Sequence, residues 1–175
     1  MLVKPAWIMF NFNDSSDVIH SVSESVYTLN AELDKIEFSD DKVNVYVFWG
    51  NGCPHCADLK ELLKTYYNDS LKDKFNVYGF EVWYNKENTN LMFSIADLVG
   101  NRSDVTGVPY LVIGKSTMIG YADYNASKVK EMLEAEINKK PSDRTDYMKK
   151  YIEKLNNGEV TTTPVATTST TKKKK

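Results

Sequence analysis

The chain has 175 residues, of which 42% are hydrophobic, and this length and composition suit one packed domain with extensions. Its 22 basic and 24 acidic residues give a net charge of −2. Such a balance provides no basic surface for a phosphate backbone, so we expect no nucleic-acid partner. No stretch approaches the roughly 18 apolar residues that a membrane-spanning helix needs.

Residues 1–15 predict an irregular lead-in. Its apolar run, residues 6–10, is short for a signal-peptide core and no small-residue cleavage site follows it. We therefore expect either that the protein stays where it is made or that its natural precursor carries a leader or anchor. Apolar residues from Val18 to Ile36 then recur at three- and four-residue steps, which predicts a helix with Ser16 or Asp17 as its N-cap.

Residues 43–49 form an uncharged run of β-branched and aromatic side chains that predicts a buried strand. After a break at Gly50–Gly52, the next helix begins at the cysteines. Asp58, Lys60, Glu61 and Lys64 would form its outer face. Its expected inner face consists of Cys56, Leu59, Leu62, Leu63 and Tyr66.

The second half of the chain predicts a strand at 75–83, a helix at 90–99 that ends at Gly100, and a strand that begins after Pro109. We expect a hairpin turn at Lys115–Ser116 before another short strand. Two further helices are predicted at 126–138 and, largely polar, at 142–156. The Thr-rich segment that ends in four lysines is expected to be disordered.

This order predicts an α/β fold, with a central mixed sheet of about four strands flanked by helices. An extra helix precedes the domain and a C-terminal helix follows it. The expected divisions are an irregular lead-in at 1–15, the domain with its N-terminal helix at 16–140, a helical extension at 141–158, and a disordered tail at 159–175.

The two cysteines, Cys53 and Cys56, are three positions apart, which closes almost no loop and so favours reactivity over stapling. On the first turn of a helix they can form a small disulfide ring, and the unpaired N–H groups there favour a thiolate. We expect Cys53, at the exposed end, to be the nucleophile and Cys56, mostly covered, to be the resolving thiol. Pro54 suits the first helical turn, and His55 can stabilise the Cys53 thiolate.

A zinc site is the main alternative for a Cys-x-x-Cys pair. Zinc needs four ligands, and the chain has only two histidines, His20 and His55. His20 lies among apolar neighbours and is interpreted as structural. We therefore expect no metal, and no cofactor beyond a redox-active Cys53–Cys56 disulfide.

A Gly-x-Pro sequence, Gly107-Val108-Pro109, precedes the third strand at the chain distance expected for a partner of the cysteine pair. With Phe48-Trp49 and the Cys-Pro-His-Cys motif, it resembles the thioredoxin superfamily, and within it the oxidants of the DsbA type. The resemblance covers residues 43–138. It implies that Pro109 is cis and faces the cysteines, and that Val108 pairs with the substrate by β-augmentation.

The chain departs from this family in two places. Val47 occupies the position, six residues before Cys53, where many members have a buried carboxylate that assists proton transfer. Glu81 could substitute for it, although a solvated glutamate is the simpler interpretation. The segment 85–106 is too short for the helical insertion of the long oxidants, so a minimal domain is expected.

Trp49 and Tyr110 are candidate substrate-binding residues at an apolar rim, with simple core packing as an equal alternative. The resemblance implies an enzyme that exchanges disulfides with protein substrates, as oxidant or isomerase, and a redox partner that recycles it. The alternatives are a reducing thioredoxin-like protein and a peptide- or metal-binding module. We expect a monomer outside the cytoplasm or at the cell surface, with a cytoplasmic location as the alternative. Association with a membrane, for instance through the lysine-rich tail, stays open.

Overall fold

The computed structural model describes residues 33–160, in which four strands form one mixed sheet in the order β2-β1-β3-β4. The predicted α/β architecture is confirmed. The lead-in, most of the predicted N-terminal helix with His20, and the tail from residue 161 lie outside the described residues. The strands are β1 (Val43–Trp49), β2 (Phe75–Glu81), β3 (Tyr110–Ile113) and β4 (Ser116–Ile119).

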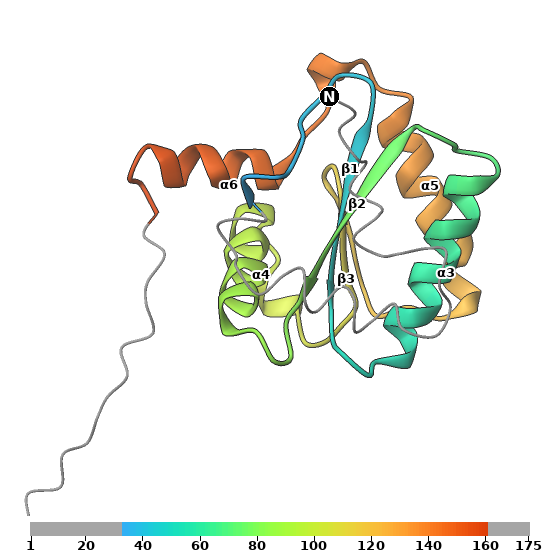
Figure 1. Cartoon of the computed structure of the whole chain (residues 1–175), viewed down its shortest axis with the longest axis horizontal. Coiled ribbons are helices and arrows are strands. Elements are labelled where there is room, and N and C mark those ends of the chain that lie inside the picture. Colours follow the sequence, from blue (N-terminus) through green and yellow to red (C-terminus); the bar gives the residue numbers. More distant parts are fainter. Residues whose placement is uncertain (1–32, 161–175) are drawn as a thin grey trace, which may run out of the picture.

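Helices cover both faces of this sheet (Figure 1). β1 pairs in parallel with β2 and antiparallel with β3, which forms a hairpin with β4. Helices α3 and α5 lie on one side of the strands, and α4 and α6 lie on the other. This arrangement is consistent with the thioredoxin-like fold that the sequence resemblance implies. The helices are α3 (Pro54–Asn68), α4 (Lys86–Val99), α5 (Ala126–Ile137) and α6 (Tyr147–Asn156).

The core is centred on β1, whose seven residues are all buried. The ring of Phe48 stacks between those of Phe80, at 5.4 Å, and Tyr110, at 5.8 Å, and so joins the three central strands. Full burial of each such side chain contributes about 1.5–3 kcal/mol. Because both neighbours and both faces of β1 are occupied, its position in the fold is fixed.

The buried face of α3 differs from the predicted one. Lys60, expected outside, is 6% exposed, and Tyr67 is buried while Leu62 and Tyr66 are only partly covered. The long apolar stem of a lysine can be covered while its ammonium group reaches a polar partner, here the Glu61 carboxylate at 3.6 Å.

Several predicted boundaries shift for local reasons. The hairpin turn lies at Gly114–Lys115, one residue earlier than expected, because Gly114 adopts the left-handed φ of +57° that glycine tolerates. Helix α4 begins at Lys86 because Asn85 caps it by accepting a hydrogen bond from the Asn88 amide. It ends at Gly100, as predicted. Helix α6 begins only at Tyr147, capped by Asp146.

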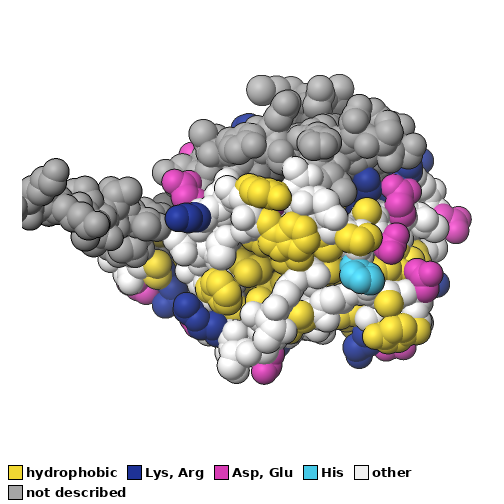
Figure 2. Space-filling model, turned by 90° about the horizontal axis from the view of Figure 1, so that it is seen from below, with side chains coloured by type: hydrophobic (Ala, Val, Ile, Leu, Met, Phe, Trp, Pro, Cys, Tyr) yellow, Lys and Arg dark blue, Asp and Glu magenta, His cyan; other side chains and the backbone are white. Residues whose placement is uncertain are grey.

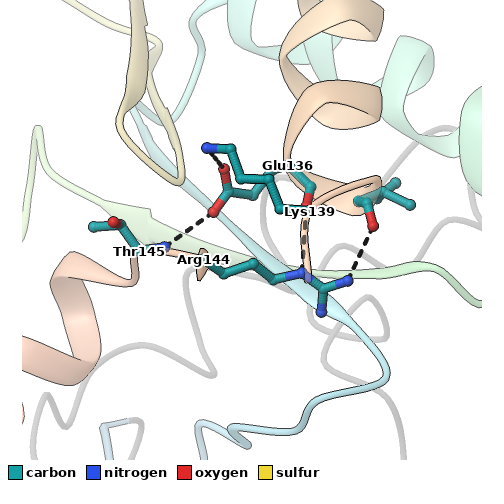
Figure 3. A network of polar contacts seen from close by, with 5 residues as sticks. Glu136, Lys139, Arg144 and Thr145 are labelled. Atoms are coloured by element: carbon teal, nitrogen blue, oxygen red, sulfur yellow. Dashed lines mark hydrogen bonds and ion pairs between the residues drawn. The ribbon is translucent and has the colours of Figure 1, made fainter. Parts of the chain in front are cut away.

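A polar network fixes the link between α5 and α6 (Figure 3). The buried Glu136 carboxylate accepts hydrogen bonds from Lys139 Nζ, at 2.6 Å, and from the Thr145 amide, at 3.1 Å. The Arg144 guanidinium donates to the backbone carbonyls of Ile137 and Asp40, at 3.0 and 2.7 Å. These contacts tie the last turn of α5 to the segment that precedes β1.

Asp146 joins α6 to β1 through a second polar contact. Its carboxylate accepts hydrogen bonds from the Lys149 amide, at 2.9 Å, and from the hydroxyl of Tyr46, at 2.8 Å. Burial raises the pKa of Asp146 above its usual value of 3.8, against the opposing effect of these hydrogen bonds. Burial, and then the nearby Asp146, raises the pKa of Tyr46 well above 10, so Tyr46 stays a hydroxyl donor.

We predict that Asp146→Asn becomes more stable relative to the natural chain as the pH rises from about 4 to 7. A carboxyl group whose pKa is raised by folding binds more protons in the folded state, so its contribution to stability falls as the pH rises through the folded pKa. Asparagine also caps helices well. Urea unfolding at a series of pH values measures the difference.

The control is Asp146→Ala, which removes the cap and leaves the buried Tyr46 hydroxyl without its acceptor. We expect it to cost about 2 kcal/mol of unfolding free energy at neutral pH. A stability difference between the natural chain and Asp146→Asn that does not change with pH would contradict this account.

Candidate functional site

The site is built on the turn that follows β1. The chain leaves Trp49, turns through Gly50–Gly52 and enters α3, with the Cys53 amide donating to the Gly50 carbonyl at 3.0 Å. Gly52 has a φ of +92°, a left-handed conformation that favours glycine. The turn therefore places Cys53 directly in front of the helix.

Cys53 and Cys56 form a disulfide across the first turn of α3, with Cα atoms 5.3 Å apart. Cys53 is the N-cap residue, and its Sγ accepts a hydrogen bond from the Cys56 amide at 3.2 Å. Pro54 is the first residue of the helix, as predicted. The sulfur of Cys53 thus lies at the positive end of the helix dipole, where a thiolate is stabilised.

The two cysteines are covered almost equally. Cys53 is 4% exposed and Cys56 is 5% exposed, so the predicted exposure of Cys53 is wrong for the disulfide form. Pro54 and His55 are the exposed residues of the motif.

The peptide bond between Val108 and Pro109 is cis. Pro109 is buried and immediately precedes Tyr110, the register partner of Phe48 in β1. Its carbonyl accepts the Gly120 amide at 2.8 Å, which ties the end of β4 to it. Pro109 therefore lies at the same end of the sheet as the disulfide, next to a partly exposed Val108.

Trp49 and Tyr110 belong to the core and do not form an exposed rim. They are 3% and 0% exposed, respectively. The Tyr110 hydroxyl donates to the Asn101 side chain at 3.0 Å, and burial raises the pKa of Tyr110 to about 12. Of the two interpretations that the sequence allows, core packing describes both side chains.

Two exposed aromatic residues near the site were not singled out from the sequence. Trp83 and Tyr84, in the connection from β2 to α4, are 53% and 76% exposed. A Cβ atom at Gly50 would collide with the Trp83 ring, so this ring lies against the turn before Cys53. Figure 2 shows this end of the molecule, where hydrophobic side chains gather beside a histidine. The signal in the sequence that could have identified them is their position as two adjacent aromatic residues at the end of the predicted strand.

Glu81 is buried beneath the same turn, with 3% of its surface exposed, so the interpretation as a solvated glutamate is wrong. Its carboxylate accepts hydrogen bonds from three backbone amides, those of Asn51, Trp83 and Tyr84. By taking the amides of Trp83 and Tyr84, it also ends β2 two residues before the predicted position. Val47, by contrast, is an ordinary buried apolar residue.

Within residues 33–160, no group of three or more His, Cys, Asp or Glu side chains could hold a metal ion. No helix in this described range is long and apolar enough to cross a membrane. Comparison with known proteins finds neither a protein-family model nor a curated protein that matches the chain.

We predict that Gly50→Ala destabilises the fold by about 1–3 kcal/mol, because the new methyl group overlaps the Trp83 ring. Combining it with Trp83→Ser should remove most of this penalty, and urea unfolding of both single variants and the double variant measures the coupling. Gly107→Ala is the matched control, since a Cβ there meets no atom within 4 Å. Additive costs for Gly50→Ala and Trp83→Ser would show that the two residues do not touch.

Proposed function

We propose that the chain is a thiol–disulfide oxidoreductase that acts through Cys53 and Cys56. The observation that carries this proposal is the Cys53–Cys56 disulfide at the N-terminus of α3, where Cys53 Sγ accepts the Cys56 amide. A disulfide that closes four residues contributes little to the stability of a fold, so its value lies in its chemistry. The α/β fold with its mixed sheet supports the same proposal.

The exchange proceeds through a mixed disulfide. When the enzyme acts as an oxidant, a substrate thiolate attacks Cys53 Sγ, the Cys53–Cys56 bond breaks, and Cys56 leaves as a thiolate. A second substrate thiolate then attacks the substrate sulfur of the mixed disulfide, and Cys53 leaves as a thiolate. The substrate gains a disulfide and loses two electrons, which the two cysteines hold until a redox partner removes them.

The surroundings of Cys53 support oxidation or isomerisation over reduction. A thiolate that is stabilised by a helix N-terminus and a backbone N–H is a good leaving group, which raises the reduction potential of the pair. His55, two residues after Cys53 in the sequence, is exposed, and an imidazole at this position can supply a further donor to the thiolate. The Cys-Pro-His-Cys motif is that of the DsbA-type oxidants. Because such an oxidant needs an oxidising compartment, we propose a site of action outside the cytoplasm or at the cell surface.

The substrates we propose are proteins. The cis peptide at Val108–Pro109 is at the same end of the sheet as the disulfide and leaves Val108 partly exposed for β-augmentation by an extended segment. The exposed rings of Trp83 and Tyr84 lie on the other side of β1, in the connection after β2. A polypeptide next to Cys53 can therefore contact the protein through its backbone and through apolar side chains.

We predict a reduction potential between about −120 and −200 mV for the Cys53–Cys56 pair, measured by equilibration with glutathione buffers. Cys53→Ser should abolish exchange with a disulfide-containing protein. Cys56→Ser should instead trap a mixed disulfide that is visible on a non-reducing gel.

A potential near the value of about −270 mV typical of thioredoxin would favour the reducing alternative. A Cys53 thiol that alkylates slowly at neutral pH would argue against the enzyme. Stoichiometric, chelator-sensitive zinc in the purified chain would support a binding module.

We also predict that Tyr84→Ser slows exchange with a peptide disulfide flanked by aromatic residues about three- to tenfold, but leaves exchange with oxidised glutathione unchanged. This decrease in rate corresponds to the free energy that is gained when part of one aromatic ring is buried against the substrate. Phe38→Ser is the control, because Phe38 is an exposed aromatic residue beside Val43, at the opposite end of β1. Equal effects of Tyr84→Ser on both substrates would show that Tyr84 does not contact the polypeptide.

A further inference from the structure

Glu81 is the buried charged group closest in the sheet to the turn that carries the disulfide. It ends β2 and is the register partner of Trp49, the last residue of β1. Oε1 accepts the amides of Asn51, at 3.1 Å, and Trp83, at 2.9 Å, and Oε2 accepts the amide of Tyr84, at 3.0 Å. One carboxylate therefore joins two separate loops at the same end of the sheet.

Burial of a carboxylate is costly unless hydrogen bonds compensate it, and three charge-assisted bonds to backbone amides do so here. A shorter or neutral side chain could end β2 without this cost. The feature that needs the reach of a glutamate is the bond to Asn51, which belongs to a segment 30 residues away in the sequence. The hydrogen bond to the turn before Cys53 is therefore the contact that distinguishes a glutamate at this position from a shorter or neutral side chain.

This contact lies two residues from the reactive sulfur. Asn51 stands between Gly50 and Gly52, so the turn has little stiffness of its own. The Gly50 carbonyl accepts the Cys53 amide, and Cys53 in turn caps α3 through its Sγ. Fixing the Asn51 amide consequently fixes the direction from which the chain enters the N-cap position.

We propose that Glu81 is a positioning residue of the disulfide site, which acts through the Asn51 amide to keep Cys53 Sγ on the Cys56 N–H when the disulfide is reduced. The inference rests on the proposed redox function and deepens it. It differs from a proton relay, because the contacts of the carboxylate described above are with backbone amides. Glu81 prepares the thiolate site by holding the backbone, without touching the reacting atoms.

Two conservative substitutions separate the position of the carboxylate from its charge. Glu81→Asp keeps the negative charge but is one methylene too short to reach all three amides. Glu81→Gln keeps the length and an oxygen acceptor for the Asn51 and Trp83 amides, but removes the charge and the acceptor of the Tyr84 amide. A negative charge close to a thiolate disfavours it, so loss of the charge would favour the Cys53 thiolate.

The test uses the reduced full-length chain and measures the rate of Cys53 alkylation by iodoacetamide as a function of pH. We expect Glu81→Asp to move the midpoint of this pH–rate profile up by about 0.5–1 pH unit, because the thiolate loses part of its hydrogen bond. In Glu81→Gln the midpoint should stay where it is in the natural chain or move to lower pH. Glu87→Gln, on the exposed first turn of α4, is the matched control and should change nothing.

Amide hydrogen exchange supplies a second readout in variants that are less stable but still folded. In Glu81→Asp the Asn51 amide should lose protection, while amides in the centre of β1 keep theirs. A midpoint that does not move in Glu81→Asp, or that rises equally in Glu81→Gln, would overturn the positioning role. Failure of the proposed function is seen separately, as an absence of disulfide exchange in the natural chain.

Discussion

The double-sided burial of β1 is the constraint on which the rest of this structure depends. The strand has a hydrogen-bonded neighbour on each edge and helices over each face, and all seven of its residues are buried. The point at which the chain leaves the sheet after Trp49 is therefore fixed. The turn at Gly50–Gly52 and the N-cap at Cys53 follow within four residues, and Tyr110 brings the cis peptide to the same end through its pairing with Phe48.

Buried carboxylates then fix the loops at the ends of the sheet. Glu81 holds an amide of the turn before Cys53 and amides of the connection after β2, and Glu136 holds the Thr145 amide in the link to α6. Asp146 caps α6 while it binds the Tyr46 hydroxyl. Each carboxylate is costly to bury and gains hydrogen bonds only in one arrangement of the chain. These groups consequently specify which loop conformation is formed, while the aromatic core supplies most of the stability.

The elements that the sequence predicted correctly depend on local signals. The run at 43–49, the N-terminus of α3 at Pro54 and the end of α4 at Gly100 each follow from a few adjacent residues. The burial of Lys60 was not predicted, because a helix pattern assigns a residue by its charged end although its apolar stem can be covered. For Glu81 the simpler interpretation was wrong, because a charged residue in a strand pattern does not reveal partners that are distant in sequence. The predicted exposure of Cys53 was wrong as well, since a position at the start of a helix does not show which other parts of the chain cover it.

The difference between local signals and contacts that are distant in sequence also matters at Val47, where the chain has no carboxylate. In that position an acid would lie on β1, six residues before Cys53, and would act on a proton. Here the buried acid lies on the neighbouring strand, at the register position of Trp49, and binds backbone amides of the turn. Under the proposed function, Cys53 leaves as a thiolate at the N-terminus of α3, whose geometry the acid is proposed to maintain. Backbone donors that are already in place before the reaction can stabilise such a leaving thiolate without a proton transfer to Cys53.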